Sequence, residues 1–224
     1  AATYLSGLLS NVQRKNVESI AYEHDQDRNS LQHFIGRAPW DDAPQRRELA
    51  RQVGCELGEA DGVLVFDPSS FAKKGRESVG VARQWCGRLG KVDNCQVGVY
   101  LAYVARREHA LVDARLYLPE EWAKDKRRRK KAGVPREVRF ATRHELALQM
   151  LDEHGATLPH RWITGDDEMG RPSGFRRELR ARKEQYLLMV PSNITIRDLG
   201  APLPEYCGHG RHPKQPFQRV DRWA

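Results

Sequence analysis

Apolar residues recur every three or four positions through the first quarter of the chain, which is the spacing typical of helices. Leu5, Leu8 and Leu9 form the first such group, and similar groups follow along the segment. Asp41 precedes the last group and is expected to cap the first turn of that helix. The pattern therefore predicts a small all-helical unit over residues 1–58.

The pattern then changes to runs that are typical of strands. Residues 62–66 are apolar and rich in β-branched side chains, and the polar sequence Asp67-Pro68-Ser69-Ser70 follows them. Such a run predicts a short buried strand that delivers Asp67 at its carboxyl end. Residues 96–104 and 110–118 predict two more strands, which we expect to form an antiparallel hairpin.

The second half of the chain alternates helix and strand patterns. Thr142 and Glu145 have the spacing of a capping box, which predicts a helix over residues 142–154. Further elements are predicted as a strand at 161–164, a helix at 173–183 and a strand at 186–190. Over residues 59–199 the order is β-β-β-α-β-α-β, which predicts a mixed sheet with helices packed on it. This is the element order of an α/β, ribonuclease-H-like fold.

Residues 200–224 differ in character from the rest of the chain. Four of the twelve prolines fall here, which predicts an extended or loop segment. A fold of this order normally needs one more helix after the last strand, so we expect the sequence to be incomplete.

The charge of the chain indicates a class of partner. Lys and Arg exceed Asp and Glu by 38 to 30, a net charge of +8. Nucleic acid is the leading partner, because each basic side chain that neutralises a phosphate releases condensed counterions. The alternative is an ordinary basic protein that binds no nucleic acid.

Other features of the composition narrow the class of protein. The apolar stretches are far shorter than the ~20 residues that a membrane span needs, and no secretory signal is visible. We therefore expect a cytoplasmic protein with no membrane partner. The four cysteines lack paired short spacing, so neither a disulfide framework nor a four-cysteine zinc site is predicted. The segment Cys207–His212 likewise lacks the second half of a zinc site.

Two aspartates at strand ends are the candidate catalytic and metal-binding residues, Asp67 and Asp166. In a sheet of the predicted order their strands are neighbours, so both carboxylates can converge on one cation. This suits phosphodiester cleavage, in which two divalent ions ~3.5–4 Å apart activate the attacking oxygen and stabilise the leaving one. The competing interpretation is that Asp67 is only a turn or cap residue. Periodicity alone does not choose between Asp166, Asp167 and Glu168.

Basic segments accompany these acids. Those beyond Asp67 could hold a phosphate beside the metals or form a solvated loop, and Lys124 to Lys131 could be a DNA-binding patch or an exposed linker. The candidate nucleic-acid contacts are Lys73, Lys74, Arg76, Arg83, Lys91, Lys126, Arg127 and Arg128.

Longer motifs carry a family resemblance. Residues 65–75 (VFDPSSFAKKG), 78–84 (SVGVARQ) and 86–96 (CGRLGKVDNCQ) follow one another closely and form one block. This block resembles insertion-sequence transposases of the DDE class, most closely the family numbered seven hundred and one. Residues 4–9 are similar to that family's helical opening. Residues 162–166 (WITGD) are similar to its second catalytic strand, which selects Asp166 over Asp167.

The resemblance implies a function. It implies a ribonuclease-H-like catalytic core that uses Mg²⁺ or Mn²⁺, cuts double-stranded DNA at transposon ends and transfers the freed 3′-hydroxyl into target DNA. It also implies a homodimer on two ends, at the bacterial nucleoid, and a DNA-binding role for the helical unit over residues 1–58. The resemblance also implies a glutamate as the third metal ligand, located after an insertion. Residues 204–211 resemble the start of that insertion. We therefore expect the chain to stop before the glutamate. Two alternatives stay open: a truncated, non-catalytic DNA-binding repressor of transposition, and an unrelated metal nuclease of the same fold.

Overall fold

The structure is a computed structural model that describes residues 1–38 and 41–223. The chain divides into two compact units, Ala1–Pro44 and Gln45–Ala224.

The first unit contains three short helices, as the apolar spacing predicts. They are α1 (Ala2–Leu9), α2 (Val17–Glu23) and α3 (Arg28–Gly36). Asn16 and Asp27 cap α2 and α3 by accepting hydrogen bonds from backbone N–H groups of the first turn. Gly7 allows α1 and α2 to pack closely, because a Cβ at this position would lie 2.3 Å from Cγ2 of Ile20.

The fourth helix packs with the sheet instead. Helix α4 (Ala43–Glu56) begins after Asp41, whose carboxylate accepts a hydrogen bond from the Ala43 N–H at 3.2 Å. Ala50 and Val53 are buried in the main core beside Leu64 of the sheet. The predicted helical unit ran to residue 58, whereas the compact units separate at Pro44, so α4 belongs to the second unit.

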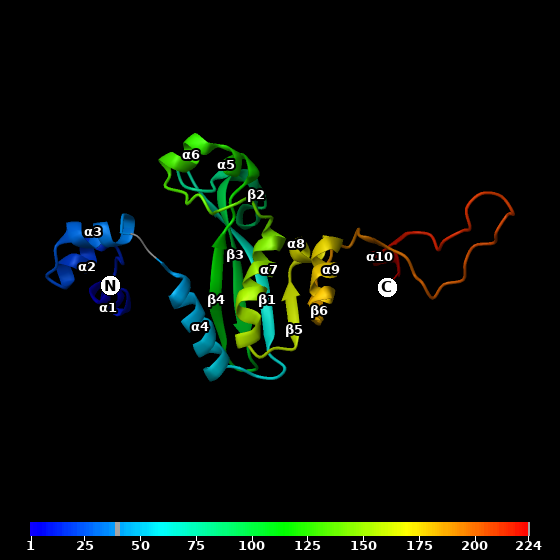
Figure 1. Ribbon diagram of the computed structural model, residues 1–224, viewed down its shortest axis with the longest axis horizontal. Helices are drawn as coiled ribbons and strands as arrows, with labels where there is room; N and C mark the ends of the chain where they lie inside the picture. Colours follow the sequence, from blue (N-terminus) through cyan, green and yellow to red (C-terminus); the bar gives the residue numbers. More distant parts are fainter. Residues whose placement is uncertain (39–40, 224) are drawn as a thin grey trace. The chain divides into compact units, whose positions relative to one another are not determined.

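The sheet has the predicted topology (Figure 1). Its strands are β1 (Val63–Ala72), β2 (Ala82–Cys86), β3 (Lys91–Val104), β4 (His109–Leu116), β5 (Trp162–Gly165) and β6 (Tyr186–Leu188). Strand β3 is antiparallel to β1 and β4, whereas β5 is parallel to both β1 and β6. Helix α7 (Arg143–His154) connects β4 to β5, and α9 (Ser173–Ala181) connects β5 to β6. The predicted order β-β-β-α-β-α-β and the ribonuclease-H-like mixed sheet are confirmed, with β2 as an addition that the sequence pattern did not predict.

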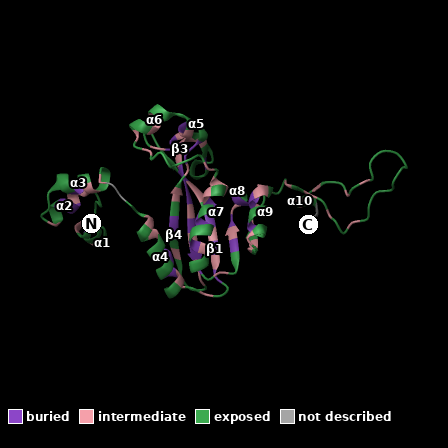
Figure 2. Cartoon of the chain, viewed as in Figure 1, coloured by how far each residue is buried: buried purple, intermediate pink, exposed green. Residues whose placement is uncertain are grey.

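One face of the sheet carries the core. Leu64, Phe66 and Ile163 are buried there against α7, which contributes Met150 and Leu151. Helices α4 and α9 add their buried side chains to the same cluster, and the buried residues gather where α7 lies on the sheet (Figure 2). The capping box that anchors the start of α7 is present, as its sequence spacing predicts.

Strand β1 is longer than its apolar run. The sequence predicts that the strand ends at Asp67, but β1 continues to Ala72 and pairs with β3 along its whole length. Pro68 is tolerated because backbone hydrogen bonds alternate between the two edges of a strand. The Lys73 N–H donates to the Asn94 carbonyl at 2.8 Å, so by alternation the nitrogen of Pro68 faces the other edge, where β5 has already ended.

A small lobe packs at one end of the sheet (Figure 1). It contains β2, a 3₁₀ turn η1 (Gly87–Leu89) and two helices, α5 (Glu120–Lys124) and α6 (Lys126–Lys131). Val81, Leu118 and Trp122 form its core. The Trp122 indole N–H donates to the Val81 carbonyl at 2.7 Å. The basic segment that was expected to be a patch or a linker is thus partly helical.

The remaining elements are short. They are a second 3₁₀ turn η2 (Gly155–Thr157), helix α8 (Asp167–Gly170), the paired strands β7 (Thr195–Ile196) and β8 (Gln218–Arg219), and helix α10 (Val220–Trp223). Residues 200–217 contain neither helix nor strand, as their prolines predict. Within the described residues, no helix combines the length and the apolar character that crossing a bilayer requires.

Candidate metal centre

Asp67 and Asp166 lie at the same level of two neighbouring strands. The last parallel pair between β1 and β5 joins Phe66 to Gly165; Asp67 is the next residue of β1, and Asp166 is the first residue after β5 ends. Side chains alternate between the faces of a strand, and Phe66 points into the core. The side chains of both aspartates therefore leave the backbone on the sheet face opposite the core helices. A site built from two carboxylates requires this arrangement.

The carboxylate of Asp67 is exposed and has one neighbouring donor. The Ser69 hydroxyl, two residues along the same face of β1, donates to Oδ2 of Asp67 at 2.6 Å. Because β1 continues past Asp67, the aspartate is held in a regular strand and does not belong to a turn. Its backbone position is thereby fixed by pairing with Tyr100 of β3.

Asp166 is held by the helix that follows it. Its Oδ1 accepts a hydrogen bond from the Met169 N–H at 3.2 Å, which makes Asp166 the N-cap of α8. Gly165 allows this tight turn, because a Cβ there would lie 2.9 Å from Cβ of Met169 and 3.0 Å from the Phe66 carbonyl oxygen. The sequence Gly165-Asp166 thus positions one carboxylate directly beside β1.

The electrostatics of this pair favour a cation. Burial raises the pKa of Asp166, and the charges of Glu168, Asp67 and Asp167 raise it further, against the opposing hydrogen bond from Met169. Within the described residues, no basic side chain forms an ion pair with Asp67 or Asp166. The two carboxylates therefore repel each other without compensation, and oxygen ligands of this kind fit a hard divalent ion.

The two acids next to Asp166 are compensated. Asp167 pairs with Arg171 at 3.4 Å, and Glu168 pairs with Arg143 at 2.5 Å. The other guanidinium nitrogen of Arg143 donates to Gln84 of β2 at 3.1 Å, so this arginine joins α7, α8 and the lobe. Among the three consecutive acids, Asp166 is the one without a cationic partner in the described part of the chain.

The predicted nucleic-acid contacts lie mainly on the lobe. The structure places them as follows: Lys73, Lys74 and Arg76 are exposed in the loop after β1, Arg83 is exposed on β2, Lys91 begins β3, and Lys126, Arg127 and Arg128 begin α6. Two of them have partners among the residues that the structure describes. Lys91 pairs with Asp93 at 3.1 Å. Arg128 donates to the Arg76 carbonyl at 2.6 Å and lies 3.7 Å above the Trp122 ring.

A second group of possible ligands, which the sequence pattern did not single out, lies behind the sheet. Asp113, Glu153 and His154 each bring one ligand atom within 4.8 Å of the others. Asp113 is fully buried and is contacted by Arg115 at 2.8 Å, by His154 at 3.0 Å and by Arg46 at 3.6 Å. Because the guanidinium groups of Arg115 and Arg46 already balance its charge, the group fits a buried ion network better than a divalent ion. The sequence signal that could have identified this group is Asp113, an acid at a position of a predicted strand that faces the core.

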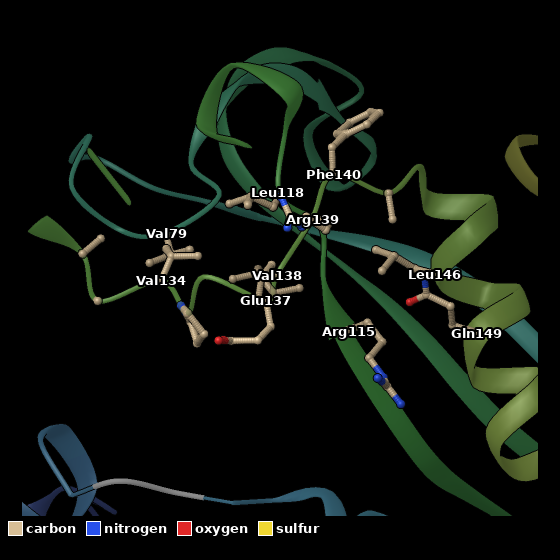
Figure 3. A pocket seen from close by; sticks show the side chains of 15 residues that line it. Val79, Arg115, Leu118, Val134, Glu137, Val138, Arg139, Phe140, Leu146 and Gln149 are labelled. Carbon is tan, nitrogen blue, oxygen red and sulfur yellow. The ribbon is translucent and has the colours of Figure 1, made fainter. Parts of the chain in front are cut away.

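Neither aspartate lines the cavity in Figure 3. It has a volume of about 630 Å³ and lies between residues 132–141, strand β4 and helix α7. Leu118, Val134 and Phe140 give it mainly apolar walls. The candidate metal centre is therefore on an open sheet face and is separate from this cavity.

Comparisons with known proteins agree on one family. The sequence profile of the DDE superfamily endonucleases matches residues 1–224. The chain is 36% identical over 97 residues to a protein of Microchaete diplosiphon named "Probable transposase for insertion sequence element IS701". The aligned part covers 42% of this chain and 25% of that relative. The resemblance to insertion-sequence transposases is therefore confirmed by an independent match.

Solved structures give only remote likenesses. The Mos1 transposase paired-end complex with left transposon end has a TM-score of 0.26 and 11% identity, over 84% of this chain and 58% of that chain. A pre-cleavage Mos1 transpososome has a TM-score of 0.22 and 8% identity, over 82% of this chain and 57% of that chain. Scores this low establish neither a shared fold nor a shared activity.

Proposed function

Because the chain belongs to the DDE superfamily of endonucleases, we propose that it is the core of a DNA transposase that cuts transposon ends by metal-dependent phosphodiester chemistry. The observation that carries this proposal is the placement of Asp67 and Asp166. They follow the last pair of two parallel strands, on one open face, with no compensating cation among the described residues.

In this proposal the two aspartates hold Mg²⁺ or Mn²⁺. Bound divalent ions would supply the activation of an attacking oxygen and the stabilisation of the leaving one. The chain's own groups position the ligands: the Ser69 hydroxyl orients the carboxylate of Asp67, and the Met169 N–H holds that of Asp166. Gly165 keeps α8 close to β1, so that both carboxylates stay at one level of the sheet.

Double-stranded DNA is the proposed substrate. The net charge of +8 supports it, as do the exposed basic residues on the lobe and on the loop that follows Asp67. The phosphate contacts are assigned to Lys73, Lys74, Arg76, Arg83, Lys126 and Arg127, with Lys91 and Arg128 as further candidates. The helices over residues 1–38 are proposed as an additional DNA-binding unit, and a homodimer as the form that joins two ends.

The match covers a quarter of the relative, so transposition by the whole protein is part of the proposal. The resemblance calls for a third acidic ligand, a glutamate, in addition to the two aspartates. Glu168 does not fill this place in the structure, because its carboxylate is held by Arg143. A non-catalytic DNA-binding protein that occupies the ends is the alternative outcome.

A nicking assay tests the proposal. The purified chain is mixed with Mn²⁺ and DNA that carries the ends of its own element, and single-strand breaks are mapped. Asp67→Ala and Asp166→Ala should each abolish nicking and leave DNA binding intact, whereas Asp167→Asn should still nick. If the Asp67→Ala variant still nicks DNA, the site assignment is wrong. Tight binding without nicking, in wild type and variants alike, would favour the non-catalytic alternative.

A further inference from the structure

The loop after β1 must cross the sheet. Cys95 of β3 lies opposite Ala72 of β1 and also opposite Ala82 of β2, so these two strands flank β3 on opposite edges. Residues 73–81 connect them. The connection therefore passes over one face of β3.

Hydrogen bonds identify that face. The Asn94 side-chain amide donates to the carbonyls of Lys73 at 2.6 Å and Gly75 at 2.9 Å, and the Gln96 amide donates to the Val79 carbonyl at 2.5 Å. Asn94 and Gln96 alternate with buried residues of β3, so they share the open face with Tyr100, which is the partner of Asp67. The loop, with its basic residues, thus crosses the face that carries Asp67.

Beyond the crossing, the same face exposes an aromatic and apolar pair. Trp85 of β2 and Val92 of β3 lie opposite each other, and each is 53% exposed. Arg83, two residues before Trp85, lies opposite Asn94 and is also exposed. Exposed apolar side chains that lie next to one another mark a candidate interaction surface.

On the other side of the crossing, Phe71 extends the surface toward the metal centre. It is 44% exposed and lies 6.4 Å from the Tyr100 ring, between Asp67 and the loop. We define the aromatic–basic face as Phe71, Lys73, Arg83, Trp85 and Val92. The face combines apolar and aromatic side chains with the positive charges of Lys73 and Arg83, and Glu77 of the crossing loop is paired with Lys131 at 2.6 Å.

We propose that the aromatic–basic face binds unpaired nucleotides of the strand whose phosphate lies at the metal centre, with a base stacked on Trp85. The inference rests on the proposed function, since it concerns the same nucleic acid. An aromatic side chain can stack only on a base whose ring surface is accessible, and in a base-paired duplex the neighbouring bases cover that surface. Arg83 and Lys73 supply the charge that a phosphate backbone requires. Along β3, Val92 is at most about 27 Å from Tyr100, a span that a short unpaired strand can cover.

Binding measurements on the full 224-residue chain test this inference. The probes are a fluorescent dT20 strand and a 20-base-pair duplex, both in EDTA, so that neither metal nor cleavage contributes. Trp85→Ala should weaken dT20 binding by about 5- to 100-fold and duplex binding by less than about twofold. Trp85→Phe should keep most of the affinity, because a phenyl ring still stacks. Arg83→Gln should reduce the salt dependence of dT20 binding by about one counterion.

Trp162 provides a matched control. It is 38% exposed on the same sheet face, next to Arg161, but at the far end of β5. Trp162→Ala should leave dT20 binding unchanged. The inference is overturned if Trp85→Ala leaves dT20 binding unchanged, if it weakens dT20 and duplex equally, or if Trp162→Ala has the same effect. A chain that binds neither probe would point to a protein partner and would also overturn it.

The result is separable from the proposed function. The dT20 assay contains no metal, so the effect of Trp85→Ala in it does not depend on the metal assignment. Loss of nicking in the Asp67 variants with a normal response to Trp85→Ala supports both proposals. If the Asp67 variants still nick DNA and Trp85→Ala still weakens dT20 binding, the metal assignment is wrong and the proposed role of the aromatic–basic face is retained.

Discussion

Asp67 and Asp166 follow Phe66 and Gly165, which are the last residues that β1 and β5 pair in parallel. A one-residue shift in this register would turn one of the two carboxylates toward the core. The candidate centre therefore depends on strand register, and residues 99 positions apart in the chain meet because the sheet brings them to one level.

Gly165 allows α8 and Asp166 to lie close to β1 in this register. Gly165→Ala should lower the free energy of unfolding by about 1–3 kcal/mol, because the added methyl group meets Met169 and the Phe66 carbonyl. Mn²⁺ affinity should fall as well, since α8 and Asp166 are displaced together. Gly174→Ala, in α9 with open space around it, is the control and should be neutral or slightly stabilising. Equal stability of the two variants, measured by denaturant unfolding, would contradict this account.

Asp166→Asn should stabilise the metal-free chain at pH 7. Asparagine still caps α8, but it removes a charge that burial and three neighbouring carboxylates disfavour. The gain should stay below about 1 kcal/mol, because the side chain is only partly buried and solvent screens it. Mn²⁺ should then raise the melting temperature of the wild type and have little effect on the variant. If the variant is less stable than the wild type without metal, the charge of Asp166 does not destabilise the folded chain.

The pH dependence of this gain has a defined sign. The pKa of Asp166 is higher in the folded chain than its ordinary value of 3.8. Below 3.8 both states are protonated and the carboxyl costs nothing. As the pH rises from 3.8 through the raised folded value, ionisation increasingly disfavours the folded state. The difference between Asp166→Asn and wild type should therefore vanish near pH 3 and be complete at neutral pH.

The network behind the sheet should be structural. Arg115→Met leaves the fully buried Asp113 with one fewer cation, and it should cost about 3 kcal/mol of unfolding free energy. Arg51→Met, which removes the exposed pair with Glu48, is the control and should cost less than about 1 kcal/mol. Chemical denaturation compares the two. Similar costs would mean that the buried network contributes no more than a surface pair.

Glu153 adds a pH-dependent part to that network. Burial raises the pKa of Glu153, but the hydrogen bond and charge of Arg115 outweigh burial and hold the pKa below 4.5. Its ion pair therefore stabilises the folded chain above pH 4.5 and loses this effect as the pH falls through the lowered value. Glu153→Gln should be less stable than wild type at pH 7, and the two unfolding curves should converge in acid. A difference that grows in acid would reverse the assignment.

The sequence predicted the fold where periodicity was strong. The run before Asp67, the capping box at Thr142 and the apolar run before Asp166 each have a local pattern, and each element was found. Other features depend on long-range contacts that no local pattern contains. Strand β1 runs through Pro68 because β3 pairs with its other edge, and α4 joins the sheet because Val53 fits its core.

The candidate site was predictable only in part. Apolar strands mark the two aspartates, whereas the choice of Asp166 over its acidic neighbours needed the family resemblance. In the structure the physical reason is visible, because Arg171 and Arg143 lie beside Asp167 and Glu168. The exposed position of Trp85 could not be read from the sequence, since it follows from a crossing loop that places β2 on the far edge of β3.

The most direct test of the metal centre is a Mn²⁺ titration, by calorimetry, of the wild-type chain and four variants. Asp67→Asn and Asp166→Asn should each weaken Mn²⁺ binding by at least about tenfold. Asp167→Asn and Asp113→Asn should bind Mn²⁺ like the wild type, because those carboxylates already have cationic partners. Wild-type affinity in Asp67→Asn, or loss of binding in Asp113→Asn alone, would contradict the assignment and place the ion elsewhere.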